Sequence, residues 1–210
     1  YYKPHYDVGG DYYDVIQLSE NEIGFCMADV SGKGISAAIL MSNFQANLRA
    51  LFTKEVDLTE LISILNERVL RSANGEKFIT LFLAKYNYSS KELQYINAGH
   101  NPPLLYNLEN KKLELLKSGC VGMGMLDELP FVNMKVVKID SKMKLFTYTD
   151  GLVELMEDEN VEWGTKFIEE KISNAESIKK NIKVIIKEQG IEKGNAAIFD
   201  DISILGVEFN

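Results

Sequence analysis

Aspartates follow strand-like apolar runs at four places along this chain. The segments are residues 9–14 (GGDYYD), residues 28–34 (ADVSGKG), residues 148–151 (YTDG) and the pair Asp200-Asp201. In each, the aspartate stands where a hydrophobic run gives way to glycine or to the last strand. Burying a carboxylate beside strands without a partner is costly. Carboxylates from several strand ends are what a hard divalent cation requires, so the pattern predicts a metal site.

The residue types at these positions favour Mn²⁺ or Mg²⁺. Both ions prefer octahedral oxygen coordination and usually retain waters, so a few carboxylates and a carbonyl suffice. Asp29 is the best candidate to bridge two ions, because it ends a buried strand and precedes the turn Ser31-Gly32-Lys33-Gly34. His5 and His100 are the only histidines and no cysteine pair accompanies them, which argues against zinc.

Simpler interpretations of the same residues exist. Asp150-Gly151 can be an ordinary turn dipeptide, Asp11 and Asp14 can be surface residues of an edge strand, and Asp200 can merely start a strand. His100, within residues 97–103 (NAGHNPP), can be a general acid or a turn histidine that holds the backbone. The Gly-Lys pair does not form a nucleotide-binding loop, because the required glycine and Ser/Thr are replaced by methionine and glycine.

Composition limits the partners. The net charge is −8 and no basic cluster stands out, so a nucleic-acid partner is not expected. Only Arg49, Arg68 and Arg71 could supply guanidinium groups, so metal ions must do most of the binding if the substrate is a phosphate. The isolated cysteines Cys26 and Cys120 suit a reducing cytoplasm as structural residues.

The sequence predicts a domain cut from a longer protein. It begins with tyrosine rather than methionine, close to the first acidic segment. No apolar run is long enough to cross a bilayer, so no membrane contact by this domain is expected, although the parent protein could be tethered.

Hydrophobic periodicity predicts strands and helices in groups rather than in alternation. Strands are expected at residues 7–18, 23–29, 77–88, 92–97, 103–107, 113–116, 131–139, 142–149 and 202–209, and helices at residues 35–52, 58–70, 165–173 and 177–188. Helical spacing predicts the apolar positions of three of these helices: Ile35, Ala38, Ile39, Leu48 and Leu51; Leu58, Leu61, Ile62, Leu65 and Val69; and Ile178, Ile182, Ile185 and Ile186. Asp57 and Glu60 resemble a capping pair for the second helix. Residues 131–139 and 142–149 are expected to pair around Asp140-Ser141. This order does not fit a parallel βαβ fold and favours an α+β fold of antiparallel sheets with helices on their outer faces.

Five ordered motifs then resemble a known family. The chain is similar to the bacterial stress-response and sporulation branch of the metal-dependent protein phosphatase 2C family, over essentially residues 7–209. The motifs that carry the resemblance are residues 9–14, 28–34, 97–100, 148–151 and 200–203. The resemblance implies a single domain over residues 1–210, folded as an antiparallel β-sandwich flanked by pairs of helices in four layers (αββα).

The resemblance also assigns the site residues. It implies two Mn²⁺ or Mg²⁺ ions, both bridged by Asp29. The Val30 carbonyl and Asp11 would bind the second ion, Asp11 either directly or through water, while Asp150 and Asp200 would hold the first. Asp201 is a weaker candidate ligand. The nucleophile would be a metal-bound water.

Two departures from eukaryotic relatives matter. Ser31 stands where those relatives carry a histidine, so a general acid from that position is missing. His100 stands where they carry an aspartate that helps to hold a third metal ion, which makes a third ion doubtful. A phosphate-binding arginine near the first strand is also missing, with only Lys3 nearby.

The function implied by the resemblance is a protein serine/threonine phosphatase that acts in partner switching and sigma-factor regulation. Its substrate would be a phosphorylated anti-sigma-factor antagonist or a similar phosphoprotein. An N-terminal sensor domain or other activator would act through the helices at residues 35–71. The alternatives are a catalytically silent phosphatase-like binding module and a phosphatase of small molecules.

Overall fold

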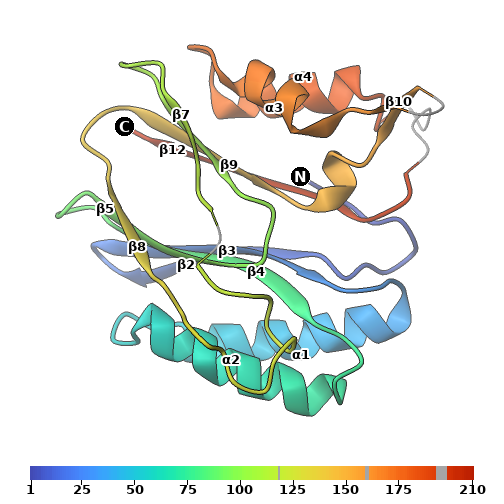
Figure 1. Ribbon diagram of the computed structural model, residues 1–210. Helices are drawn as coiled ribbons and strands as arrows, with labels where there is room; N and C mark the ends of the chain where they lie inside the picture. Colours follow the sequence, from blue (N-terminus) through green and yellow to red (C-terminus); the bar gives the residue numbers. More distant parts are fainter. Residues whose placement is uncertain (118, 159–160, 193–197) are drawn as a thin grey trace. The chain divides into compact units, whose positions relative to one another are not determined.

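The computed structural model describes residues 1–117, 119–158, 161–192 and 198–210 as two compact units. The α1–α2 unit comprises Tyr6–His100 and Lys117–Ile139, and the α3–α4 unit comprises Tyr1–His5, Asn101–Leu116 and Asp140–Asn210. Each unit contains one five-stranded antiparallel sheet and two helices (Figure 1). The predicted α+β class with antiparallel sheets is confirmed.

The sheet of the α1–α2 unit has the order β2-β3-β4-β5-β8. Every neighbouring pair is antiparallel, and β3 pairs with β4 over its full length. Residues Gly24 through Ala28 of β3 are all buried, as their apolar sequence predicts. The strands are β2 (Tyr12–Ser19), β3 (Glu22–Val30), β4 (Ile79–Asn87), β5 (Glu92–Ala98) and β8 (Lys135–Lys138).

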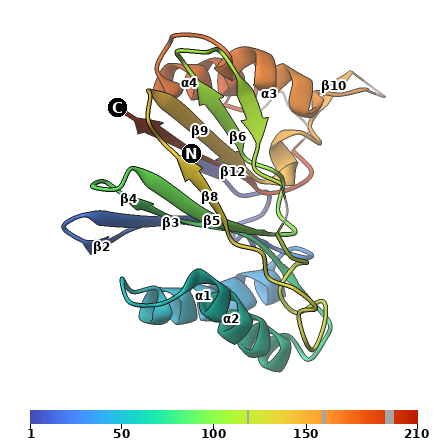
Figure 2. The same cartoon turned by 60° about the vertical axis from the view of Figure 1, so that its left-hand side comes forward.

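Helices α1 (Ile35–Leu51) and α2 (Leu58–Ala73) lie side by side on one face of this sheet (Figure 2). Asp57 caps α2, since its carboxylate accepts hydrogen bonds from the Thr59 and Glu60 N–H groups. The predicted apolar stripe of α2 is buried throughout: Leu58, Leu61, Ile62, Leu65 and Val69.

The predicted apolar face of α1 is partly wrong. Ile35 and Ile39 are 73% and 59% exposed. The buried stripe is displaced around the helix and follows the i, i+3, i+4, i+7 spacing of one helical face. It consists of Ala37, Leu40, Met41, Phe44 and Leu48.

The sheet of the α3–α4 unit has the order β1-β12-β9-β6-β7. Its strands are β1 (Tyr2–Lys3), β6 (Leu104–Asn107), β7 (Leu113–Leu115), β9 (Met143–Tyr148) and β12 (Ile202–Phe209). A 3₁₀ turn, η1 (Asp150–Leu152), follows β9, and β10 (Met156–Asp158) pairs with β11 (Val161–Glu162). None of β1, η1, β10 and β11 was predicted from the sequence.

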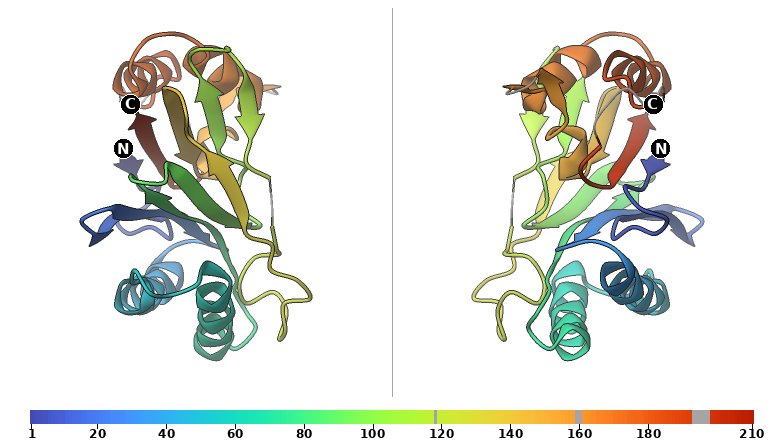
Figure 3. Two further views of the ribbon diagram at one scale, coloured as in Figure 1. Left: turned by 90° about the vertical axis from the view of Figure 1, so that its left-hand side faces the viewer. Right: turned by 90° about the vertical axis from the view of Figure 1, so that its right-hand side faces the viewer.

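Helices α3 (Gly164–Ile172) and α4 (Ile178–Glu188) cover one face of this second sheet (Figure 3). The isoleucines of α4 have the predicted helical spacing, and Ile178, Ile185 and Ile186 are buried. Ser177 caps α4 by accepting a hydrogen bond from the Lys180 N–H group.

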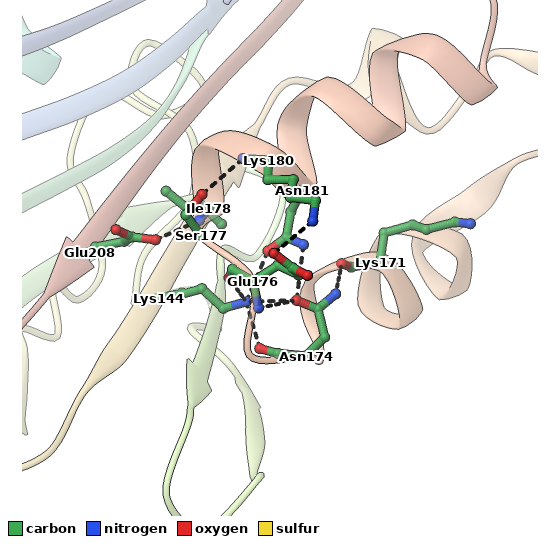
Figure 4. Close-up of polar contacts among 9 residues, drawn as sticks. All are labelled: Lys144, Lys171, Asn174, Glu176, Ser177, Ile178, Lys180, Asn181 and Glu208. Atoms are coloured by element: carbon green, nitrogen blue, oxygen red, sulfur yellow. Dashed lines mark hydrogen bonds and ion pairs between the residues drawn. The ribbon is translucent and has the colours of Figure 1, made fainter.

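The ammonium group of Lys144, on β9, lies beneath the turn between α3 and α4 (Figure 4). The Lys144 side chain donates to the carbonyl oxygens of Asn174 (2.9 Å) and Glu176 (3.1 Å) and to Asn181 Oδ1 (2.9 Å). Lys144 is only 1% exposed, and burial lowers its pKa because the charged form is desolvated. Hydrogen bonds to three acceptors offset the cost of that desolvation, and they hold the turn between α3 and α4 against the sheet.

The expected pairing of residues 131–139 with residues 142–149 is wrong. Strand β8 pairs with β5, whereas β9 lies between β12 and β6 in the other sheet. The connection Asp140-Ser141 lacks the glycine or asparagine that a two-residue hairpin turn favours. The two strands therefore continue into different sheets.

Both cysteines are buried and neither forms a disulfide. Burial raises the pKa of the Cys26 thiol and raises that of Cys120 to about 11, so both thiols stay protonated at neutral pH. This agrees with their interpretation as structural residues. Among the helices of the described ranges, none combines the length and apolar character needed to cross a membrane.

Candidate metal centre

The α1–α2 unit carries three of the five predicted ligand positions at one end of a strand pair. Asp11 directly precedes β2, while Asp29 and Val30 end β3. Tyr12 pairs with Ala28, and the Val30 N–H group donates to the Gly10 carbonyl at 3.3 Å. Continuing this register by one residue places Asp11 opposite Asp29, on the same face of the strand pair. Two half-buried aspartates therefore occupy opposite positions of the strand pair.

The turn after Val30 is fixed to the start of β4. The Ser31 N–H group donates to the Phe78 carbonyl at 2.9 Å, and the Phe78 N–H group donates to Ser31 Oγ at 2.9 Å. Lys77 Nζ also donates to the Ser31 carbonyl at 3.1 Å. Gly32 has a φ of +85°, which side-chain-bearing residues rarely adopt. Ser31 thus holds in place the backbone that carries the Val30 carbonyl.

Asp14 belongs to the same acidic segment but has a different role. It is buried, and its carboxylate accepts two hydrogen bonds from Arg49 of α1 at 2.6 and 2.8 Å and one from the Tyr12 hydroxyl. Burial alone would raise the pKa of Asp14, but the Arg49 and Tyr12 hydrogen bonds outweigh it and lower that pKa. Asp14 is therefore not a surface residue, and it joins β2 to α1.

The α3–α4 unit carries the other two predicted ligand positions. Asp150 follows β9 and starts η1, and its carbonyl accepts hydrogen bonds from Val153 and Glu154. Asp200 lies two residues before β12, the strand that pairs with β9. A Cβ atom at Gly151 would lie 2.2 Å from the Asp201 carbonyl oxygen and 3.2 Å from Asp200 Cβ. Glycine is thus required for this close approach, and the two segments carrying Asp150 and Asp200 are neighbours.

Asp201 has a structural contact of its own. Its Oδ1 atom accepts a hydrogen bond from the His5 N–H group at 2.7 Å, and only 7% of the residue is exposed. The Asp201 N–H group donates to Asp200 Oδ1 at 2.8 Å. These contacts fit its lower rank as a ligand candidate, because its carboxylate ties the N-terminal segment to the start of β12.

His100 lies in a structural turn. Its N–H group donates to Asn97 Oδ1 at 2.8 Å, and its ring Nδ1 is hydrogen-bonded with Thr80 Oγ1 at 2.9 Å. With 4% of the residue exposed, these contacts support a turn histidine rather than a general acid. The sequence could not distinguish these two roles, because Thr80 lies on a different strand.

The donor chemistry at the predicted positions fits a hard divalent cation. All five supply oxygen, four from carboxylates and one from a backbone carbonyl. The three arginines contact other protein groups: Arg49 binds Asp14, Arg68 binds Asn47 and Arg71 binds Glu67. Within the described ranges, no three His, Cys, Asp or Glu side chains form a group that could hold a metal ion. The complete five-residue ligand set therefore stays a prediction.

The chain matches a protein-family model over the region that contains most of these motifs. The family model described as Stage II sporulation protein E (SpoIIE) matches residues 19–210. The chain belongs to this family. The resemblance predicted from the five motifs, to the bacterial stress-response and sporulation branch of the phosphatase 2C-like proteins, is thereby confirmed.

Curated relatives of this SpoIIE-family chain are longer proteins. Protein IcfG of Synechocystis is 28% identical over the whole chain, which covers 37% of that protein. The phosphoserine phosphatase RsbU of Bacillus subtilis is 27% identical over 85% of the chain, a match that covers 54% of RsbU. The chain thus spans about half or less of the length of these relatives.

Solved structures confirm the phosphatase 2C-like fold of this SpoIIE-family member. The SiaA-PP2C domain of Pseudomonas aeruginosa has a TM-score of 0.81 at 17% identity, with 100% of this chain and 85% of that chain covered. The RsbU and RsbW domains of Rv1364c from Mycobacterium tuberculosis give a TM-score of 0.77 at 21% identity, with coverage of 96% and 57%.

Proposed function

We propose that this chain is a metal-dependent protein serine/threonine phosphatase domain. The observation that carries the proposal is the pairing of aspartates at strand ends, Asp11 beside Asp29 and Asp150 beside Asp200, in a chain of the SpoIIE family. Relatives named phosphoserine phosphatases, RsbU and RsbP of Bacillus subtilis, support the same activity.

The proposed ligands are Asp11, Asp29, Val30, Asp150 and Asp200, with Asp29 bridging two ions. Mn²⁺ or Mg²⁺, when bound, would neutralise phosphate oxygens and activate the attacking water. The chain itself contributes the orientation of these oxygens. Ser31 fixes the backbone next to Val30, and the absence of a side chain at Gly151 lets the segments of Asp150 and Asp200 approach each other. A solved relative, RsbX, is described in complex with magnesium, which supports the choice of cation.

The proposed substrate is a phosphorylated regulatory protein, an anti-sigma-factor antagonist or a similar phosphoprotein. The Rsb and SpoIIE relatives support this choice. We propose that the domain is the C-terminal catalytic part of a longer, sensor-linked protein, since it matches only part of its relatives. The two buried thiols support a reducing cytoplasm as its location.

Hydrolysis of p-nitrophenyl phosphate and of a phosphoserine peptide tests the proposal. We expect turnover with Mn²⁺ or Mg²⁺, none with a chelator, and a loss of at least about 10²-fold in Asp29→Asn and Asp150→Asn, because each removes a charged ligand. Asp140→Asn, at an exposed aspartate in the connection between β8 and β9, is the matched control and should keep full activity. Undiminished turnover in Asp29→Asn would refute the proposed chemistry. Folded protein without turnover would favour a silent binding module.

A further inference from the structure

We propose that Lys77 is a binding residue for the phosphate group of the substrate, an inference that rests on the proposed function. No guanidinium group fills this role at the acidic segments, because Arg49 is bound to Asp14 and Arg68 and Arg71 contact residues of α1 and α2. A phosphatase binds a doubly charged phosphate more tightly when a cationic side chain contacts the phosphate in addition to the metal ions. In the α1–α2 unit, Lys77 contacts the turn that directly follows Asp29 and Val30.

The ammonium group of Lys77 lies over the turn that follows the predicted ligands. Its Nζ atom is 3.1 Å from the Ser31 carbonyl oxygen and 2.7 Å from the point that a Cβ atom at Gly32 would occupy. Ser31 and Gly32 come directly after Asp29 and Val30 in the chain. The absence of a side chain at Gly32 is therefore what allows the ammonium group to approach this backbone.

The backbone next to Lys77 is held in place at Phe78. The reciprocal hydrogen bonds between Ser31 and Phe78 fix the residue after Lys77 against the turn. The Lys77 side chain is half-buried, so it has less freedom than a lysine on an open surface. This pre-positioning reduces the entropy that a flexible lysine would lose on binding an anion.

The ammonium group retains donor capacity for an anion. A lysine ammonium has three N–H donors, and the Ser31 carbonyl is the one hydrogen-bond acceptor of Lys77 in the part of the chain that the structure describes. The remaining donors can bind phosphate oxygens. Ser31 Oγ already accepts the Phe78 N–H group, so the contribution of this turn to substrate binding comes from Lys77.

Binding of inorganic phosphate to the Mn²⁺-loaded protein, measured by calorimetry, tests the inference together with hydrolysis kinetics. In Lys77→Met we expect about tenfold weaker phosphate binding and a KM raised by a similar factor, as for the loss of one hydrogen bond between charged groups. Mn²⁺ affinity should stay unchanged, and Lys77→Arg should keep phosphate affinity within about threefold. Lys33→Met, an exposed lysine of the same turn, is the matched control for the charge and should bind phosphate like the wild type.

Several results would overturn the inference. Wild-type phosphate affinity in Lys77→Met, or an equal loss in Lys33→Met, would show that Lys77 is not the contact. A parallel loss of Mn²⁺ affinity would mean that Lys77 only holds the ligand turn. If Lys77→Met lost activity toward the phosphoserine peptide but not toward p-nitrophenyl phosphate, Lys77 would instead donate a proton to the serine leaving group. Failure of the proposed function would appear separately, as a wild-type protein without metal-dependent turnover.

Discussion

The two units use the same device to fasten their helices to their sheets. In the α1–α2 unit, Lys85 of β4 donates to the Lys54 and Val56 carbonyls in the connection between the helices, at 3.2 and 3.1 Å. In the α3–α4 unit, Lys144 of β9 does the same for the α3–α4 turn (Figure 4). Each lysine is buried, with 8% and 1% of the residue exposed.

The two units differ in how much the buried lysine contributes to the stability of the packing between helices and sheet. Helices α1 and α2 contain 17 and 16 residues, whereas α3 and α4 contain 9 and 11. Longer helices bury a longer apolar stripe, and most helical stability in proteins comes from such packing. The short α3–α4 pair buries fewer apolar residues than α1 and α2, and it adds a network of Asn174, Asn181 and Lys144. Polar anchoring should therefore matter more in the α3–α4 unit.

The largest predicted effect is that of removing the Lys144 ammonium group. We expect Lys144→Met to lower the free energy of unfolding by about 3 kcal/mol, because it leaves the Asn174 and Glu176 carbonyls and Asn181 Oδ1 without the donor that they share. Lys85→Met should lower it by about 1 kcal/mol, since it removes a donor from two carbonyls only. Urea denaturation followed by circular dichroism measures both. Equal losses, or a larger loss for Lys85, would contradict the comparison.

The next effect concerns a contact of the α1–α2 unit alone. Arg49→Met should lower the free energy of unfolding, measured by urea denaturation, by less than Lys144→Met does, although it leaves the Asp14 carboxylate without its bidentate partner. Arg49 itself is half exposed, so solvent screens part of the attraction.

The Asp14–Arg49 contact also predicts a pH dependence. The pKa of Asp14 in the folded protein lies below its ordinary value of 3.8, so folding favours the charged form. Its contribution is complete above about pH 5 and is lost as the pH falls through the ordinary value and then the lower folded pKa. Asp14→Asn should remove this part of the acid sensitivity, measured as unfolding free energy between about pH 2 and 6. An identical pH profile in both proteins would refute the assignment.

The smallest predicted effect is that of Ile39→Ala, which tests the corrected buried face of α1 by comparison with Met41→Ala. Ile39→Ala should change stability by no more than about 0.5 kcal/mol because Ile39 is largely exposed, whereas Met41→Ala should cost about 2–3 kcal/mol. Thermal denaturation of the two variants compares them directly. A larger loss for Ile39 would restore the face that the sequence suggested.

Most element boundaries could be predicted from local patterns. The stripe of α2 has a strict helical period and an Asp57 cap, and both are confirmed. The buried face of α1 was harder to predict, because α1 has apolar residues on several sides and periodicity alone does not select one face. The pairing of β8 and β9 failed for another reason: neighbouring strands usually pair, and only tertiary contacts place β8 beside β5.

At the candidate site, the local part of the pattern was predictable. The position of Asp11 opposite Asp29 follows from one local antiparallel hairpin, β2–β3. The approach of the Asp200 segment to Gly151 could not be predicted, because it depends on the pairing of β9 with β12, which are about 50 residues apart in the sequence. The contacts of Asp14 and Lys77 could not be predicted either, because their partners Arg49 and Ser31 lie 35 and 46 residues away in sequence. No local period connects such positions.

Calorimetric titration with Mn²⁺ tests the central claim most directly. The proposed assignment predicts two bound ions per wild-type chain, at least about tenfold weaker binding in Asp29→Asn, and wild-type binding in Asp14→Asn, whose carboxylate is held by Arg49. Unchanged Mn²⁺ binding in Asp29→Asn would contradict the account, because the proposed bridging ligand would then hold no metal.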